Sequence, residues 1–509
     1  MAERKNFDSD FCGSLALHHI NSIQDYGYLL VLDKSDLSII QASENLSDVL
    51  HKSIQDLVGT SLAEYFSEEE LDKILQISNA GLTSRIPLTL TSAESFGADR
   101  FQVLQHTKKD SILLELEKTD KDTTRSFTEV FQTVKYISAA IEQAETVQEV
   151  CDTAIRELRK LSGFDGVLMY KFDGDWNGTV IAEDKSSKLE PYLSQTFPAS
   201  DVPKQARELY LRNPYRLIPN RAYTPVRLYP VINPLTNAFT DLSDCNLRGV
   251  AAVHLEYMKN MNVNASMSIR VIHNQSLWGL ISCHHIAEKY ISYELCSIFE
   301  WLSELISGRV TLILNKEEYR LTHDLQERRI ALTDRIYAEN LITRALLNDD
   351  TENILDLFKA SAAVVTLNGR VEARGDIPPN DDVDNLMLWL EGKNMNGVYA
   401  TTHLAGIYDD AAAYADQASG ILVIPINSDK GDFVVCFRPE VIEDIHWGGD
   451  PNQAINFEKD GKNYHPRNSF KLWKQTVTQH SLPWTKQELE VAESLRNFLF
   501  EFSTKQLGN

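Results

Sequence analysis

The chain has 509 residues, which is too long for one hydrophobic core, so about three domains are expected. Apolar residues make up 43% of it and charged residues 24%, and the formal net charge of −23 argues against partners such as nucleic acid or an anionic membrane, which need a basic surface. The sequence has no apolar run that could span a bilayer and no signal-peptide core at its N-terminus, which predicts a cytoplasmic protein.

The first ~130 residues read as a small α+β unit. Residues 26–33 and 37–43 are predicted to form two strands around a polar turn. Short helical patterns follow as far as Glu64, and the sequences RIPLTL and SILLELE alternate like further strands.

The next part of the chain predicts helix, hairpin, irregular insertion and hairpin in that order. An apolar-periodic helix is expected from Phe127 to about Leu161, and FDGVLMYKF and GTVIAED then form a hairpin around an Asp-Gly-Asp-Trp-Asn-Gly turn. A region rich in Pro and Arg, residues 191–246, is predicted to be irregular. ASMSIRVI and LWGLISCHH form a second strand pair behind it.

Residues 287–348 contain no proline and predict one long helix, which would reach about 90 Å. Apolar residues recur along it at helical spacing, and such a seam is expected to be exposed and to pair with a second copy of the chain. The seam consists of Leu295, Phe299, Leu302, Ile306, Ile313, Leu321, Leu325, Leu332 and Ile336.

The third unit begins near residue 351. Residues 362–375 form a hairpin with an Asn-Gly turn, and GILVIPI and FVVCFRPE are strand-like. The polar segment 441–465 is long for a loop in a compact domain, which makes it a functional candidate. A helix is expected from about Lys486 to Gln506.

Arginines gather around the sequence PASDVPKQARELYLRNPYR, residues 198–216. Asp201 lies between two prolines and is expected to be extended. Arg207, Arg212 and Arg216 follow it, and Arg248 comes after the insertion. Guanidinium groups bind carboxylates bidentately, so two or more that converge could hold an organic diacid. A surface ion-pair network is an equally good explanation of the spacing.

Histidines and hydroxyls form a second group. His254, His284 and His285 lie in apolar segments where a satisfied core histidine is the commoner outcome, and no carboxylate or thiolate at ligand spacing favours a metal. Ser266 and Ser268 alternate with apolar residues, so their hydroxyls share one strand face, which lines a pocket or meets solvent. The six cysteines form no CxxC pair, which argues against a zinc site or a disulfide framework.

Several motifs resemble those of bacterial phytochromes, in that family's order. PASDVP resembles its PASDIP signature, and HLEYMKNM with ASMSI and LWGLISCHH resembles the core of its bilin-binding GAF domain. FRPE, WGGDP and PRNSF resemble the tongue of its PHY domain. The resemblance implies an α+β photosensory module of three antiparallel-sheet domains joined by a long helical spine: N-terminal arm and PAS domain 1–128, GAF domain 129–312, and PHY domain 313–509, with the tongue at about 438–473.

The resemblance also implies a red/far-red photoreceptor that binds biliverdin, and a role for each matching residue. Asp201 and His254 would bind the pyrrole nitrogens directly or through water, and His284 the D-ring carbonyl. Arg216, Arg248 and Tyr210 would hold one propionate, Ser266 and Ser268 the other. The residues shaping the D-ring space would be Tyr170 and Tyr257. In the tongue, Arg467 and Ser469 would exchange at Asp201 when light converts the two states, Pr and Pfr.

The position of the cysteine that attaches the bilin differs between phytochrome subfamilies. Where plant phytochromes have a cysteine before the equivalent of His254, this chain has Val253. Cys12 precedes Ile23-Gln24 at the spacing of bacterial phytochromes, which implies a thioether at Cys12, although Asp25-Tyr26-Gly27 departs from their usual Pro-His-Gly. The arm would thread through the GAF insertion, about residues 227–256, in a figure-of-eight knot.

The sequence ends within one helix of the PHY-like region, and no Gly-rich ATP-binding motif follows His480, so a non-enzymatic module is expected. The apolar seam predicts a homodimer. Its partner would be an output domain, or a histidine kinase and its response regulator. The competing interpretation is a light-independent tandem PAS–GAF sensor of a cyclic nucleotide or heme, in which Arg216 and Arg248 hold a phosphate. That alternative leaves PRNSF, WGGDP and Cys12 unexplained.

Overall fold

The computed structural model describes residues 21–81, 85–119, 127–348, 350, 352–451, 456–457, 464–465 and 469–507. Within these residues the chain forms two compact units, the first from residues up to Ile313 with 446–473, and the second from 314–445 and 474 onward. No helix in the described part of the chain is long and apolar enough to cross a membrane.

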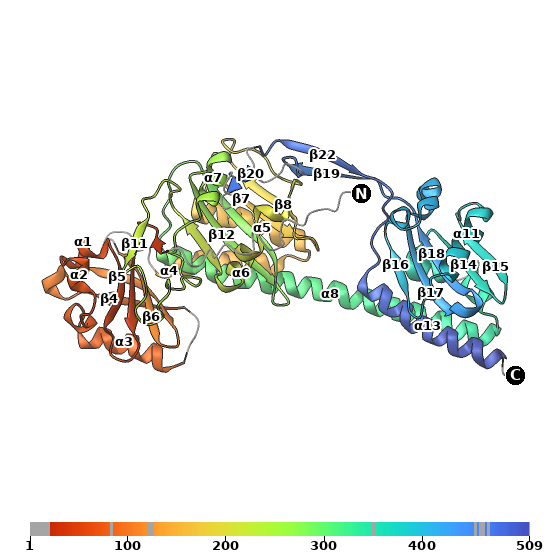
Figure 1. Cartoon of the computed structure of the whole chain (residues 1–509), viewed down its shortest axis with the longest axis horizontal. Helices are drawn as coiled ribbons and strands as arrows, with labels where there is room; N and C mark the ends of the chain where they lie inside the picture. The colour runs from red at the N-terminus through yellow and green to blue at the C-terminus, as the bar shows by residue number, and fades with distance from the viewer. Residues whose placement is uncertain are drawn as a thin grey trace. The chain divides into compact units, whose positions relative to one another are not determined.

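The first sheet of unit 1 has seven antiparallel strands in the order β1-β11-β3-β2-β6-β5-β4. Strands β4, β5, β6 and β11 of this sheet are labelled in Figure 1. Helices α1, α2 and α3 and a cluster of buried apolar residues cover one of its faces. The bounds are β1 Ser22–Ile23, β2 Tyr28–Asp33, β3 Ile39–Ser43, α1 Leu46–Leu50, α2 Ile54–Leu57, α3 Glu68–Asn79, β4 Ile86–Thr91, β5 Arg100–Thr107, β6 Ser111–Lys118 and β11 Val226–Tyr229. The strands predicted at 26–33 and 37–43 are confirmed.

Strand β11 comes from the insertion that sequence alone described as irregular, and it lies between β1 and β3. The insertion therefore packs against the first sheet and contributes buried residues such as Leu228, Leu242 and Leu247 to the apolar cluster on that sheet's second face. The predicted passage of the N-terminal arm through this insertion involves residues 1–20, which lie outside the described residues, so the knot stays a prediction.

The second sheet has the order β10-β12-β13-β7-β8-β9-β19-β22. The pairs from β10 through β9 are antiparallel, and β19 joins β9 by a parallel bridge between Trp447 and Thr196. The bounds are β7 Gly166–Phe172, β8 Gly178–Lys185, β9 Thr196–Phe197, β10 Tyr215–Ile218, β12 Ala265–His273, β13 Ser276–His285, β19 Glu443–Gly448 and β22 Leu472–Val477. Both predicted hairpins are confirmed.

Three local predictions in this region are wrong. The helix expected from 127 to 161 is two helices, α4 Phe127–Gln143 and α5 Val147–Ser162, because Thr146 and Glu149 form a capping box that starts a new helix. The irregular segment contains the nine-residue helix α6, Lys204–Arg212. Asp201 is not extended, since it lies in the 3₁₀ turn η4, Ala199–Asp201.

The long helix is α8, Tyr293–Glu339, whose 47 residues span about 70 Å. It ends before the predicted position 348, because α9, Ile342–Leu346, begins a separate helix. The seam is not exposed as expected: residues such as Phe299, Leu302 and Ile336 are fully buried. Ile336 belongs to an apolar cluster of unit 2, together with Leu325 and Leu332.

Unit 2 holds a five-stranded antiparallel sheet in the order β15-β14-β18-β17-β16. In β17 and β18, alternate residues enter two different apolar clusters, which explains the continuous apolar sequence of these central strands. The bounds are α10 Ile354–Phe358, β14 Ala362–Leu367, β15 Arg370–Gly375, α11 Asn380–Glu391, β16 Tyr399–Thr401, α12 Ala415–Ala418, β17 Gly420–Asn427, β18 Asp432–Arg438 and α13 Lys486–Leu507. Two short strands, β20 Asn456–Phe457 and β21 Tyr464–His465, pair within the tongue.

Candidate functional site

A cavity of about 240 Å³ opens on one face of the second sheet. Its floor comes from β12 and β13, where residues two apart share a face. Helix α6 and helix α7, Ala252–Asn260, supply further walls, and Asp450 and Pro451 of the tongue also line it.

Ten of the predicted site residues line this one cavity, although they come from eight separate segments of the chain. They are Tyr170, Asp201, Tyr210, Arg216, Arg248, His254, Tyr257, Ser266, Ser268 and His284. Cys12 and Arg467 lie outside the described residues. Ser469 is half-buried, and its hydroxyl accepts a hydrogen bond from the Lys471 amide at 3.4 Å.

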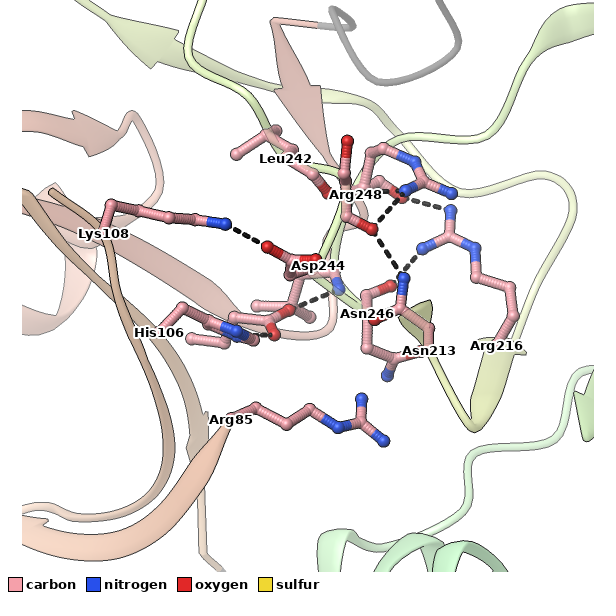
Figure 2. A network of polar contacts seen from close by, with 12 residues as sticks. Arg85, His106, Lys108, Asn213, Arg216, Leu242, Asp244, Asn246 and Arg248 are labelled. Carbon is pink, nitrogen blue, oxygen red and sulfur yellow. Dashed lines mark hydrogen bonds and ion pairs between the residues drawn. The ribbon is translucent and has the colours of Figure 1, made fainter. Parts of the chain in front are cut away.

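Two arginines meet at one end of the cavity (Figure 2). Arg216 donates to the backbone carbonyls of Asn246 and Arg248, and Arg248 donates to the Ser243 carbonyl at 3.1 Å. In the described part of the chain, neither guanidinium forms an ion pair with a carboxylate. Burial, followed by the charge of Arg216, lowers the pKa of Arg248 to about 9. Two like charges at this site, one half-buried and one buried, favour an anion between them.

Hydroxyl groups line the cavity beside these arginines. Ser266 and Ser268 point into it from β12, and Tyr210 forms a hydrogen bond with Ser268. Ser282 and Asn213 also line it and were not predicted. Ser282 could have been found, because it lies two residues before His284 on the same strand face.

The opposite wall brings Asp201, Tyr257 and the tongue together. The Tyr257 hydroxyl donates to Asp201 Oδ2 at 2.8 Å. The ring of Phe470 packs edge-on against Tyr257, with centroids 5.0 Å apart, and the ring of His254 stacks parallel to Tyr257 at 6.2 Å. His254 lies on helix α7, not on a strand as its apolar surroundings suggested.

The cavity keeps both of its histidines neutral near pH 7. Burial lowers the pKa of His254 to about 4, with the charge of Arg216 adding to the effect. Burial also lowers the pKa of His284 to about 4, with a smaller contribution from His254. His285, next along the chain, points elsewhere and pairs with Asp165 at 2.9 Å.

These low pKa values predict a pH dependence of stability in the ligand-free protein. Each imidazole binds a proton in the unfolded chain below about pH 6.5 but stays neutral in the folded chain down to about pH 4. Stability is therefore lost as the pH falls from 7 to 5, by less than complete burial would give, because the His254 side chain is exposed and the His284 side chain is half-buried. Urea unfolding at the two pH values should show a smaller loss of stability in His254→Gln than in the parent. An identical loss in both proteins would contradict a lowered pKa at His254.

Comparison with known proteins identifies the family to which this chain belongs. Residues 12–119 match the model described as PAS fold, 146–310 the GAF domain, and 325–507 the phytochrome region. The chain resembles the Stigmatella aurantiaca phytochrome photosensory core module with a TM-score of 0.82 and 33% identity, covering 97% of this chain and 98% of that one. This chain belongs to the phytochrome family.

Other phytochromes give the same result. A bacteriophytochrome of R. palustris aligns with a TM-score of 0.81, 32% identity, 96% coverage of this chain and 98% of that one. Cyanobacterial phytochrome B of Nostoc sp. is 37% identical over 96% of this chain and 65% of its own length. The bacteriophytochrome of Pseudomonas aeruginosa is 34% identical over 96% of this chain and 66% of its own length. The chain thus spans about two thirds of these curated phytochromes, and the predicted family and fold class are confirmed.

Proposed function

We propose that this phytochrome chain is a red/far-red photoreceptor whose cavity holds biliverdin, attached to Cys12 by a thioether. The observation that carries the proposal is the pair of cavity arginines, the half-buried Arg216 and the buried Arg248, which have no carboxylate partner among the described residues. A linear tetrapyrrole has two propionates, and one of them would supply the missing anion. When bound, it would supply light absorption and isomerisation of the double bond next to its D ring.

Different residues of the chain would bind different parts of the biliverdin. Arg216, Arg248 and Tyr210 hold one propionate, and Ser266 and Ser268 hold the other. The Asp201 carbonyl accepts hydrogen bonds from the pyrrole N–H groups, with His254 holding a water on their other side. A neutral imidazole carries one ring N–H, and this single donor is enough for a hydrogen bond from His284 to the D-ring carbonyl. Tyr170 and Tyr257 bound the space in which the ring turns.

An absorption spectrum tests the proposal. After co-expression with heme oxygenase, the purified protein should be green-blue and should show reversible difference spectra under red and far-red light. A colourless protein that binds a cyclic nucleotide or heme would establish the light-independent sensor instead, because a phosphate or a heme propionate also suits two arginines.

We further propose that the module acts as a homodimer, that it is not itself an enzyme, that it works in the cytoplasm, and that it signals to an output domain or a histidine kinase. Since the predicted seam of α8 is buried, the supporting feature is another face of this helix. Trp301, Leu312, Tyr319 and Ile330 are 47, 56, 71 and 49% exposed. Their intervals alternate between eleven and seven residues, which keeps them within about 20° of one line along the helix.

Charged substitutions on this face should therefore abolish the dimer. The double variant Leu312→Glu with Tyr319→Glu is expected to elute as a monomer in light-scattering chromatography at micromolar concentration, where the parent has twice the chain mass. Ile407→Glu, at a 45% exposed residue away from α8, is the matched control. A parent that is itself monomeric, or a double variant that still dimerises, would rule out this face as the interface.

A further inference from the structure

A short segment, residues 245–248, joins the first sheet to the cavity. The Leu247 amide donates to Glu115 Oε2 at 2.6 Å, and the Leu247 carbonyl accepts from the Gln24 amide at 2.8 Å. Its side chain is buried in the apolar cluster of the first sheet. A Cβ atom at Gly27 would lie 2.7 Å from the Leu247 side chain, so glycine permits this close approach. Leu247 is thus held on both sides by the first domain.

The carbonyl groups of the two residues that flank Leu247 hold Arg216. Its guanidinium donates to the carbonyls of Asn246 and Arg248, immediately before and after Leu247. The Asn246 side chain accepts from the Leu217 amide at 3.0 Å and donates to the Tyr26 hydroxyl at 2.9 Å. Figure 2 shows Asn246 and Arg248 beside Arg216, and Lys108 pairs with Asp244 just before this segment. A shift of this segment would therefore move both cavity arginines.

The acceptor of the Leu247 amide is a fully ionised carboxylate in the protein interior. Burial alone would raise the pKa of Glu115, but its bonds to His106 and Leu247 and the charge of Arg85 outweigh burial and lower it. Glu115 Oε1 lies 2.7 Å from His106 Nε2, and both side chains are 3% exposed. Hydrogen bonds to a charged acceptor are roughly twice as strong as neutral ones, so this carboxylate fixes Leu247 firmly.

Cys245 adds a thiol near this pair, and His, Glu and Cys are together a possible set of metal ligands, with donor atoms within 4.8 Å. The hydrogen bonds favour another use. Both oxygens of Glu115 already accept short hydrogen bonds, and burial raises the pKa of the Cys245 thiol well above its usual value, which opposes the thiolate that a metal needs.

We propose that Glu115, oriented by His106, is a positioning residue for the ligand-carboxylate site. It holds Leu247 and thereby sets the placement of Arg216 and Arg248 from the first domain, although it touches neither the cavity nor its ligand. The inference rests on the proposed function, because it assumes that an organic carboxylate binds between these arginines. Through Glu115, the first domain would then contribute to the preference of the cavity for the free diacid over its ester.

Equilibrium binding of biliverdin and of its dimethyl ester tests this role. A Cys12→Ser background prevents covalent capture and allows dissociation constants to be measured. The background protein should prefer the diacid over the ester. Glu115→Gln keeps the shape of the side chain and removes its charge, and should weaken diacid binding about tenfold while changing ester binding less than threefold. In Arg248→Ala, which removes the group being positioned, Glu115→Gln should have little further effect on diacid binding.

Further variants distinguish a failure of the positioning role from a failure of the proposed function. Cys245→Ser alters a buried residue of the same segment that lies outside the hydrogen-bond chain, and should keep the diacid preference. His106→Gln is a milder variant that should move the preference in the same direction if Glu115→Gln does not fold. An unchanged preference in both the Glu115 and His106 variants, or equal losses for diacid and ester, would overturn the positioning role. A background protein that binds neither compound would overturn the proposed function instead.

Discussion

Replacing Cys12 with serine is expected to abolish the covalent pigment adduct completely. The reaction would add the thiol across a vinyl group of biliverdin: sulfur bonds to one carbon and a proton goes to the other, with no change in oxidation state. The alternative position lines the cavity as Val253, which has no nucleophile. Denaturing gels stained with zinc should show a fluorescent band in the parent and none in Cys12→Ser, and mass spectrometry should show the mass of intact biliverdin added to the parent.

The other five cysteines should not substitute for Cys12. Cys151, Cys245, Cys283, Cys296 and Cys436 are all buried, and burial raises the pKa of each thiol, to about 12 for Cys151 and Cys436. Thiolate formation, which a nucleophilic cysteine requires, is therefore disfavoured at these positions. Cys245→Ser and Cys283→Ser serve as controls and should keep the adduct. An adduct that survives in Cys12→Ser and disappears in either control would show that the attachment site is elsewhere.

Substitutions in the tongue are expected to change the balance between the two light states. Arg467→Ala should destabilise the red-absorbing state and Ser469→Ala the far-red-absorbing state, each with an approximately tenfold change in dark-reversion rate or a clear change in photoproduct yield. A tenfold change corresponds to about 1.4 kcal/mol, an ordinary magnitude for one lost polar contact.

The reason is the geometry of residues two apart. In a strand Arg467 and Ser469 share a face, whereas in a helix they point about 200° apart, so refolding of the tongue would exchange the side chain presented to Asp201. The contacts of this segment support such coupling. Phe470 packs on Tyr257, Tyr257 donates to Asp201, and Asp450 lines the cavity. Rotation of the D ring would alter these surroundings and shift the population of the two tongue forms.

Measurement of both photoconversion and dark reversion is required, because a mutation can affect one state alone. Lys471→Ala is the matched control, since Lys471 is exposed and lies two residues beyond Ser469. Its photochemistry should resemble that of the parent. If Arg467→Ala and Ser469→Ala also convert and revert like the parent, the tongue is not coupled to the chromophore through Asp201.

Local patterns predicted the strands well, because alternation reports which face of a sheet is buried. The continuously apolar residues of β17 form a strand that pairs with β18, and Ser266 and Ser268, which alternate with apolar residues, both line the cavity. The helices were predicted less accurately than the strands. The break before Thr146 depends on a capping box within an otherwise periodic sequence, and α6 lies in a segment whose prolines and arginines concealed a nine-residue helix.

Contacts between distant segments could not be predicted from spacing. Leu247 and Glu115 are far apart in the chain and meet only because β11 adds to the first sheet. The burial of the α8 seam was missed for a related reason: helical periodicity identifies an apolar face, but not whether the chain's own core or a second copy covers it. The cavity residues were identified from the family resemblance, which assigned no role to Asn213 or Ser282.

The two-residue length of β9 has a consequence for the refolding of the tongue. If the tongue becomes helical and β19 leaves, β9 becomes the margin of its sheet, with unpaired backbone groups that could recruit another chain. Thr196 and Phe197 are too few to template such pairing, and within the described residues one β-bridge, between Thr196 and Trp447, joins β9 to β19. If this chain switches as proposed, a strand this short would leave few unpaired backbone groups exposed each time the tongue detaches.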